Sequence, residues 1–192
     1  MAYVTYADVL RPSARRRALT YDLAWVVGGS LFIALCARVT IPLPFTPVPV
    51  TGQTLAVLLI GVLLGSRRGV LCLLAYLAEG ALGLPVFAEG AGLAYMAGPT
   101  GGYLVGFVVA AYLTGLLAER GWDRRAGTTL LAVLLGNAVI YAFGLSWLAR
   151  FVGSERVLAV GLMPFIAGDL LKALLATAAL PLGWKPLGRN GP

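Results

Sequence analysis

Long apolar segments separated by short, arginine-bearing breaks constrain the fold of this chain more than any other feature of its sequence. Of its 192 residues, 59% are hydrophobic and only 12% are charged, whereas soluble domains contain about 25% charged residues. A membrane-spanning helix needs about 20 predominantly apolar residues. The pattern therefore predicts an all-α membrane protein with six transmembrane helices, over the approximate ranges 22–39, 55–64, 70–84, 103–117, 128–148 and 157–182.

The basic side chains predict how these helices are oriented. Eleven of the fifteen Lys and Arg residues fall in the N-terminal segment or in the breaks after the second, fourth and sixth spans, and three fall in the opposite breaks. Cytoplasmic loops are enriched in Lys and Arg, so both termini are expected to be cytoplasmic. The expected organisation is an N-terminal tail (1–20), a six-helix membrane domain (21–184) embedded in lipid, and a C-terminal tail (185–192).

Several functional classes fit this composition poorly. The chain has no histidine, and Cys36 and Cys72 lie apart in apolar spans, so the residues offer no metal cluster. Nucleic-acid binding would need the basic residues on one exposed domain rather than in short breaks. The glycine-rich stretch 98–102 lacks the GxxxxGK[ST] pattern of an ATP-binding loop. Proteolysis by paired intramembrane aspartates would need a second Asp at the depth of Asp169, and the sequence places none there.

Asp169 and Lys172, inside the last apolar segment, form the strongest candidate site. Their i, i+3 spacing places both on one face of a helix, and ionisable groups at membrane depth usually face a cavity, a partner or a transport pathway. Asn137 and Tyr141 on the fifth span are expected at a similar depth, around one chamber. The alternative is that Asp169 and Lys172 only neutralise each other, although buried pairs stabilise little once desolvation is counted.

Backbone irregularities are expected close to this site. Pro164 and Gly168 precede Asp169 and are expected to loosen the helix and free carbonyl groups. Asn137 has a simpler interpretation as a group that hydrogen bonds between helices.

Two irregular segments are expected on the outer face. Residues 41–54 contain four prolines and too few backbone donors for a helix, and so apolar a loop must be buried or line a cavity. It is interpreted as a lid with Thr51, Gln53 and Thr54 at its polar tip, a rigid spacer being the alternative. Residues 80–102 are expected to form a second outer loop. Thr100 and Tyr103 either supply polar groups at the rim of the site or only mark the start of the next helix.

Small residues on the first span suggest a contact surface. Ser30 and Ala34 give a small-xxx-small spacing that lets another membrane helix approach closely. The partner is either a separate subunit or another helix of this chain, and the spacing alone favours neither.

Five motifs, in this order along the chain, resemble the BioY family, the biotin-capturing S component of energy-coupling factor transporters. They are Pro49–Thr54 (PVTGQT), Gly83–Phe87 (GLPVF), Gly98–Tyr103 (GPTGGY), Leu135–Tyr141 (LGNAVIY) and Pro164–Lys172 (PFIAGDLLK). The resemblance implies a six-helix S-component fold in a bacterial or archaeal cell (inner) membrane. It also implies capture of biotin from outside without an enzymatic activity or cofactor, and uptake driven by a transmembrane coupling (T) subunit and two cytoplasmic ATP-binding cassette ATPases.

The resemblance also implies roles for individual residues. Asp169, with Asn137, is expected to bind the ureido group, and Lys172 either the carboxylate or the ureido oxygen. Ser30 and Ala34 are expected to contact the coupling subunit. An S component for another small vitamin and a structural membrane scaffold are the alternative functions.

Overall fold

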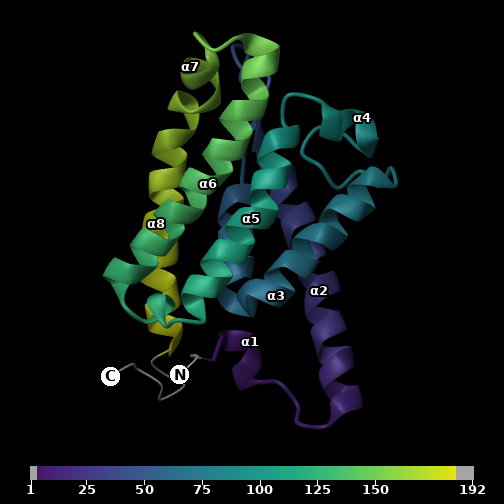
Figure 1. Ribbon diagram of the computed structural model, residues 1–192, viewed down its shortest axis with the longest axis vertical. Helices are drawn as coiled ribbons and strands as arrows, with labels where there is room; N and C mark the ends of the chain where they lie inside the picture. The colour runs from purple at the N-terminus through teal and green to yellow at the C-terminus, as the bar shows by residue number, and fades with distance from the viewer. Residues whose placement is uncertain (1–3, 185–192) are drawn as a thin grey trace.

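The apolar segments form helices through residues 4–184, the part of the chain that the computed structural model describes (Figure 1). The expected all-α membrane architecture is confirmed, since the described regular structure is helical apart from one pair of two-residue strands. The elements in order are α1 (Tyr6–Val9), α2 (Arg15–Arg38), β1 (Thr40–Ile41), β2 (Val50–Thr51), α3 (Gln53–Ala81), α4 (Gly92–Ala97), α5 (Gly101–Ala118), η1 (Trp122–Arg124), α6 (Ala126–Val152), α7 (Val157–Gly161) and α8 (Met163–Trp184).

Five helical segments among the described residues are long and apolar enough to cross a membrane, with α7 and α8 counted together. The difference from the six expected spans lies in α3, which covers both the second and the third. At Gly65 the backbone has a φ of 83°, and a Cβ on Gly69 would lie 3.2 Å from the Cα of Gly61. Eight residues of straight helix extend about 12 Å, so the two arms of α3 (53–64 and 66–81) fold back on each other.

The reversal in α3 is narrower than the sequence suggested. The break was expected over 65–69, whereas only Gly65 leaves the helical conformation. Its positive φ is readily adopted by glycine. Glu119, just after α5, secures the start of the second arm, because its Oε1 accepts hydrogen bonds from the backbone N–H (2.7 Å) and the hydroxyl (2.8 Å) of Ser66.

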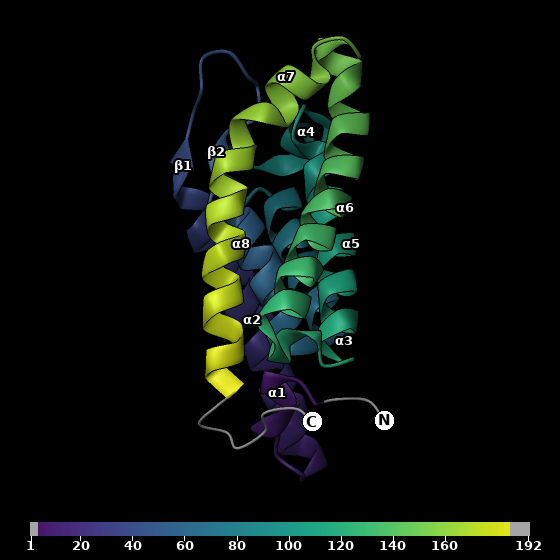
Figure 2. The same ribbon diagram turned by 90° about the vertical axis from the view of Figure 1, so that its left-hand side faces the viewer.

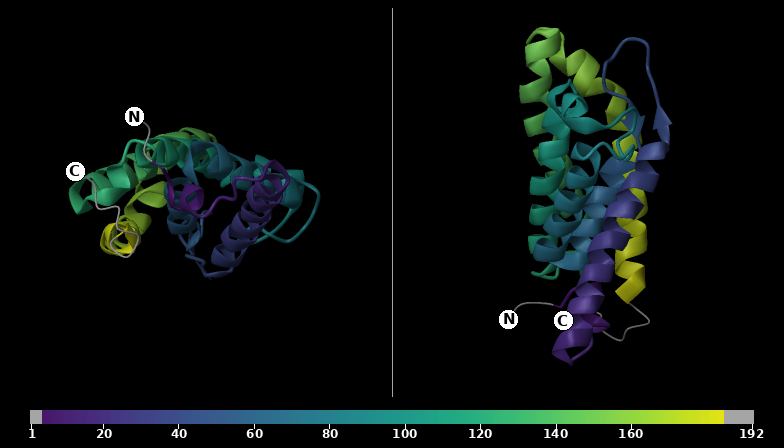
Figure 3. Two further views of the ribbon diagram at one scale, coloured as in Figure 1. Left: turned by 90° about the horizontal axis from the view of Figure 1, so that it is seen from below. Right: turned by 90° about the vertical axis from the view of Figure 1, so that its right-hand side faces the viewer.

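The helices form a bundle with α3 at its centre. α3 packs against α2 and α5, α5 packs against α6, and α6 packs against α8 (Figures 1 and 2). Close approach of α3 and α5 depends on Gly61, where a Cβ would lie 2.6 Å from the carbonyl oxygen of Ala111. Viewed along the bundle in Figure 3, α2 and α8 lie at opposite edges. Their exposed leucines, such as Leu35 on α2 and Leu171 on α8, form a surface suited to lipid.

Two irregular stretches lie at one end of the bundle, and we call them the first outer segment (40–52) and the second outer segment (82–100). In the first, β1 and β2 pair antiparallel in the register Thr40↔Thr51 and Ile41↔Val50, which closes the proline-rich loop into a short hairpin (Figure 2). This pairing was not expected from the sequence. In the second, the expected loop contains the short helix α4.

The break in the last apolar segment is not where it was expected. It lies at Leu162, between α7 and α8, and Pro164 falls in the first turn of α8. A proline there costs no hydrogen bond, because the first N–H groups of a helix have no intrahelical acceptor. Gly168 lies inside α8. The expectation that Pro164 and Gly168 loosen the helix is therefore wrong.

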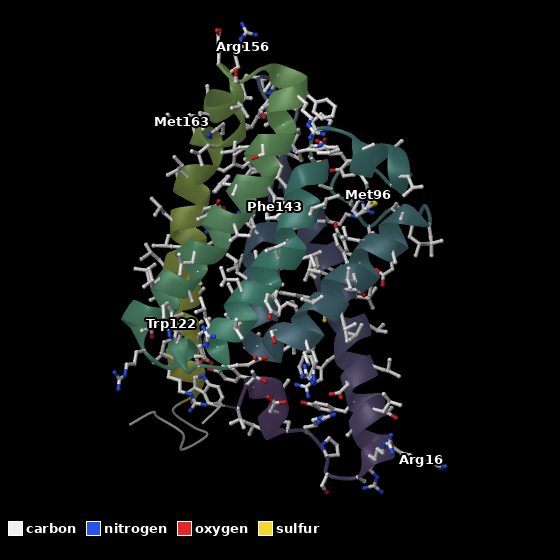
Figure 4. The ribbon with its side chains drawn as sticks, viewed as in Figure 1. Arg16, Met96, Trp122, Phe143, Arg156 and Met163 are labelled. Carbon is white, nitrogen blue, oxygen red and sulfur yellow. The ribbon has the colours of Figure 1, made fainter. Side chains whose placement is uncertain are left out.

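The arginine-bearing breaks and both ends of the described chain gather at the other end of the bundle. The ring of Tyr6 lies 4.1 Å from that of Trp184, and Arg68 pairs with Asp8 at 2.7 Å. Figure 4 shows Arg16 at this end and Arg156 at the opposite one. Positive charge accumulates on the cytoplasmic side, so this end is expected to face the cytoplasm.

The described residues, 4–184, include most of the expected N-terminal tail. α2 begins at Arg15, so the end of the expected tail 1–20 already belongs to the first long helix. The expected tail 185–192 lies outside the described residues.

Candidate ligand-binding site

A pocket lies in the outer half of the bundle, between α3, α5, α6 and α8 and beneath the two outer segments. The empty space among its atoms is about 530 Å³, including the part open to solvent. Its lining residues are Val48, Pro49, Thr51, Gln53, Thr54, Ala88, Tyr95, Thr100, Tyr103, Leu104, Phe107, Ile140, Tyr141, Phe165, Asp169 and Lys172.

Asp169 and Lys172 place an acid and a base on the α8 wall of this pocket. The Lys172 Nζ lies 3.1 Å from Asp169 Oδ1, and the two side chains are only 18% and 8% exposed. The Lys172 ammonium also donates to the carbonyl of Thr51 at 2.8 Å and to the hydroxyl of Thr54 at 2.7 Å. Asp169 accepts hydrogen bonds from the hydroxyls of Thr54 (3.2 Å) and Tyr141. The pair thus links α8 to α6 and to the start of α3.

This network determines what the site offers to a ligand. Lys172 has three N–H donors, and all three are used by Thr51, Thr54 and Asp169. A carboxylate offers about four acceptor positions, of which Asp169 uses three. Asp169 can therefore accept a ligand N–H directly, whereas a ligand oxygen that binds Lys172 must share or replace one of its present bonds.

Aromatic and aliphatic side chains form the rest of the wall. The Tyr103 ring packs on α6, where a Cβ at Gly144 would lie 2.4 Å from it, and meets the Tyr141 ring edge-on at 6.5 Å. The Tyr103 hydroxyl donates to the carbonyl of Gly161 at 2.8 Å, at the break between α7 and α8. Tyr103 therefore presents its ring to the pocket. Its hydroxyl, which was expected to be a polar group at the rim, is already bonded to the backbone of Gly161.

The outer segments contribute further polar groups. In the first, the Thr51 hydroxyl bonds to Gln53 Oε1 at 3.3 Å. In the second, Thr100 and Tyr95 line the pocket. Burial is the main cause that raises the pKa of Tyr95, so its phenol stays protonated at neutral pH.

Seven of the eight expected substrate-binding residues line this pocket: Thr51, Gln53, Thr100, Tyr103, Tyr141, Asp169 and Lys172. The eighth, Asn137, does not line it. Asn137 is buried one turn before Tyr141, and its side-chain oxygen accepts no hydrogen bond from any residue in the described range 4–184. The structure therefore does not bring Asn137 into the chamber with Asp169.

The expected partner surface on the first long helix needs a similar correction. Ser30 is fully buried, and its hydroxyl donates to Glu79 on α3 at 2.7 Å. Ala34 is partly buried against the core. Ser30 is thus inaccessible to another subunit in this structure, and its small side chain serves the packing of α2 on α3.

Some lining residues were not expected among the substrate-binding residues. Thr54 was expected only at the polar tip of the lid, although it belongs to the PVTGQT motif and directly follows Gln53. Tyr95, on α4, lies in an apolar, glycine-rich stretch that contains none of the five motifs. Its place in the pocket depends on how the second outer segment folds back.

Together, the fold and the pocket define a multi-pass membrane protein with a pocket beneath its two outer segments. The sequence profile of the BioY family matches residues 10–189, and the chain belongs to this family. Its members are substrate-binding subunits of transporters in the cell membrane rather than enzymes.

Individual relatives agree with this assignment. The chain is 42% identical to "Biotin transporter BioY" of Rhizobium etli over 157 residues, covering 77% of this chain and 84% of the relative. It is 42% identical to "Probable biotin transporter BioY" of Pyrococcus horikoshii over 149 residues, covering 77% and 88%. The crystal structure of an S-component for biotin from an ECF-type ABC transporter matches with a TM-score of 0.76 and 25% identity, over 91% of this chain and 95% of that one.

Proposed function

We propose that this chain captures biotin in the pocket beside Asp169 and Lys172 and delivers it inward as the S component of a vitamin uptake transporter. The observation that carries the proposal is a buried acid–base pair on the wall of an otherwise largely apolar pocket at membrane depth. Biotin matches this chemistry, because it combines a ureido ring with two N–H donors and a carbonyl, an apolar thiophane ring, and a tail that ends in a carboxylate.

Each part of biotin has a counterpart in the pocket. Asp169, with its remaining acceptor position, receives one ureido N–H group. Phe107, Ile140 and Phe165 offer apolar contacts to the thiophane ring. Lys172 binds either the ureido oxygen or the tail carboxylate, in exchange for one of its present hydrogen bonds.

We further propose that partners supply the energy for uptake. The sequence has no Walker A motif, so ATP hydrolysis is assigned to two separate cytoplasmic ATP-binding cassette ATPases, coupled through a transmembrane T subunit. The relative named as an S-component for biotin from an ECF-type ABC transporter supports this arrangement.

Calorimetric titration of the detergent-purified, ligand-free protein with biotin tests the proposal. One-to-one binding is expected, and Asp169→Asn should weaken it about 10- to 100-fold, because hydrogen bonds to a charged group contribute about 1.5–3 kcal/mol. Glu89→Gln is the matched control, since Glu89 is an exposed carboxylate outside the pocket lining, and it should bind biotin as the wild type does.

Two other functions predict different results. An S component for another vitamin would show no heat with biotin but a response to a different vitamin in the same titration. A structural scaffold would show no ligand response at all, and Asp169→Asn would change only its stability.

A further inference from the structure

Tyr76, a residue outside the pocket, connects the two outer segments that cover it. Its side chain is fully buried on the second arm of α3. Its hydroxyl accepts a hydrogen bond from Gln53 Nε2 at 2.6 Å and donates one to the carbonyl of Val86 at 3.2 Å. Gln53 directly follows the first outer segment, and Val86 lies in the second. One hydroxyl therefore joins both segments.

Each hydrogen bond of Tyr76 connects it to a residue that lines the pocket or lies close to one that does. Gln53 lines it and also bonds to Thr51, at the end of the β hairpin. On the other side, Val86 is two residues from Ala88, which also lines it. Tyr76 contacts neither the pocket nor the pair of charges on α8.

Aromatic packing holds the second outer segment to the same point. The Phe87 ring is fully buried, meets the Tyr76 ring edge-on at 5.4 Å and stacks on the Tyr95 ring at 5.1 Å. It fits because α3 has a glycine at Gly80, where a Cβ would lie 2.0 Å from the Phe87 ring. The ring of Tyr76 thus supports the segment sterically, and its hydroxyl adds the link to Gln53.

We infer that Tyr76 is a positioning residue that couples the first and second outer segments into one cover, so that loosening either segment loosens the other and releases the ligand. This inference rests on the proposed binding of biotin in the pocket. The first segment is attached to the bundle through β2 and Gln53 and through Val48, which is buried in the hydrophobic core. A connection at Gln53 can control how long the cover stays closed.

Tyr76→Phe tests the coupling, because it removes the hydroxyl and keeps the ring that packs on Phe87. The dissociation rate of biotin should rise about tenfold, as expected for the net loss of one to two hydrogen bonds, with the association rate changed less than about threefold. Tyr112→Phe is the matched control, because Tyr112 is exposed on α5, and its rates should equal those of the wild type. An unchanged dissociation rate in Tyr76→Phe overturns the inference.

Hydrogen exchange in the ligand-free protein gives a second readout that does not depend on biotin. Gln53→Leu should speed exchange over residues 82–91, to which Gln53 is linked through Tyr76. In a Tyr76→Phe background the same change should add nothing there. A purely local role for Tyr76 predicts that Gln53→Leu leaves 82–91 unchanged, which would overturn the coupling. If the wild type does not bind biotin, the proposed function fails while the exchange result still decides the coupling.

Discussion

Lys172→Met is expected to destabilise the ligand-free protein by leaving a buried carboxylate without its counter-charge. Asp169 and Lys172 are 8% and 18% exposed, and removing one partner of a buried pair costs about 3–5 kcal/mol. Asp169 would keep its hydrogen bonds from Thr54 and Tyr141, so the lower value of about 3 kcal/mol applies. At about 2–4 °C per kcal/mol for a chain of this size, the midpoint of thermal unfolding should fall by about 6–12 °C.

The double variant Asp169→Asn/Lys172→Met separates a charge effect from a packing effect. It contains no unpaired charge, so it should recover at least half of the loss in the single variant. The assay is thermal unfolding of the ligand-free proteins in one detergent, followed by tryptophan fluorescence. Leu171→Met, at an exposed position on α8, is the matched control for introducing methionine. A single variant within about 2 °C of the wild type, or a double variant with additive losses, would show that the unpaired carboxylate does not cause the loss of stability.

Two further predictions concern the inner half of the fold. Gly65→Ala should destabilise the protein by about 1–3 kcal/mol in a denaturation experiment, because φ is 83° there and a Cβ would lie 2.8 Å from a carboxylate oxygen. The control is Gly127→Ala, in open space at the start of α6, which should be neutral or slightly stabilising in the same experiment. Burial raises the pKa of Asp8, but hydrogen bonds from Arg68 and Thr5 outweigh burial, so the pKa is lowered below the ordinary 3.8. The contribution of Asp8 to stability should therefore be present above pH 3.8 and be lost as the pH falls through the lowered pKa. In Asp8→Asn, this loss should be missing from the acid limb of the pH–stability curve.

The charged part of the site could be predicted because its signal is local. An acid and a base three residues apart in an apolar run identify one helix face without knowledge of the fold. The helices were predictable for the same reason, since apolar length and arginine-bearing breaks are read directly from the chain. Thr51 and Gln53 were reached through the rule that an apolar, proline-rich segment cannot remain in water.

The predictions that failed, and the contacts that were not predicted, depend on which neighbour a side chain meets in the fold. The small-residue spacing of Ser30 and Ala34 is the same whether the face meets another subunit or α3, and only the fold shows that it meets α3. Pro164 is equally compatible with a kink and with a helix start. The link between Gln53 and Tyr76 joins residues 23 positions apart, and no pattern within either segment indicates it.

A structure of the protein crystallised with biotin would show directly whether the vitamin occupies the pocket beside Asp169. Biotin is expected between α3, α5, α6 and α8, with a ureido nitrogen about 2.7–3.2 Å from a carboxylate oxygen of Asp169. The position of the Lys172 ammonium would then show whether it binds the ureido oxygen or the tail carboxylate. Biotin bound elsewhere, or bound in the pocket with no polar contact to Asp169, would contradict the account.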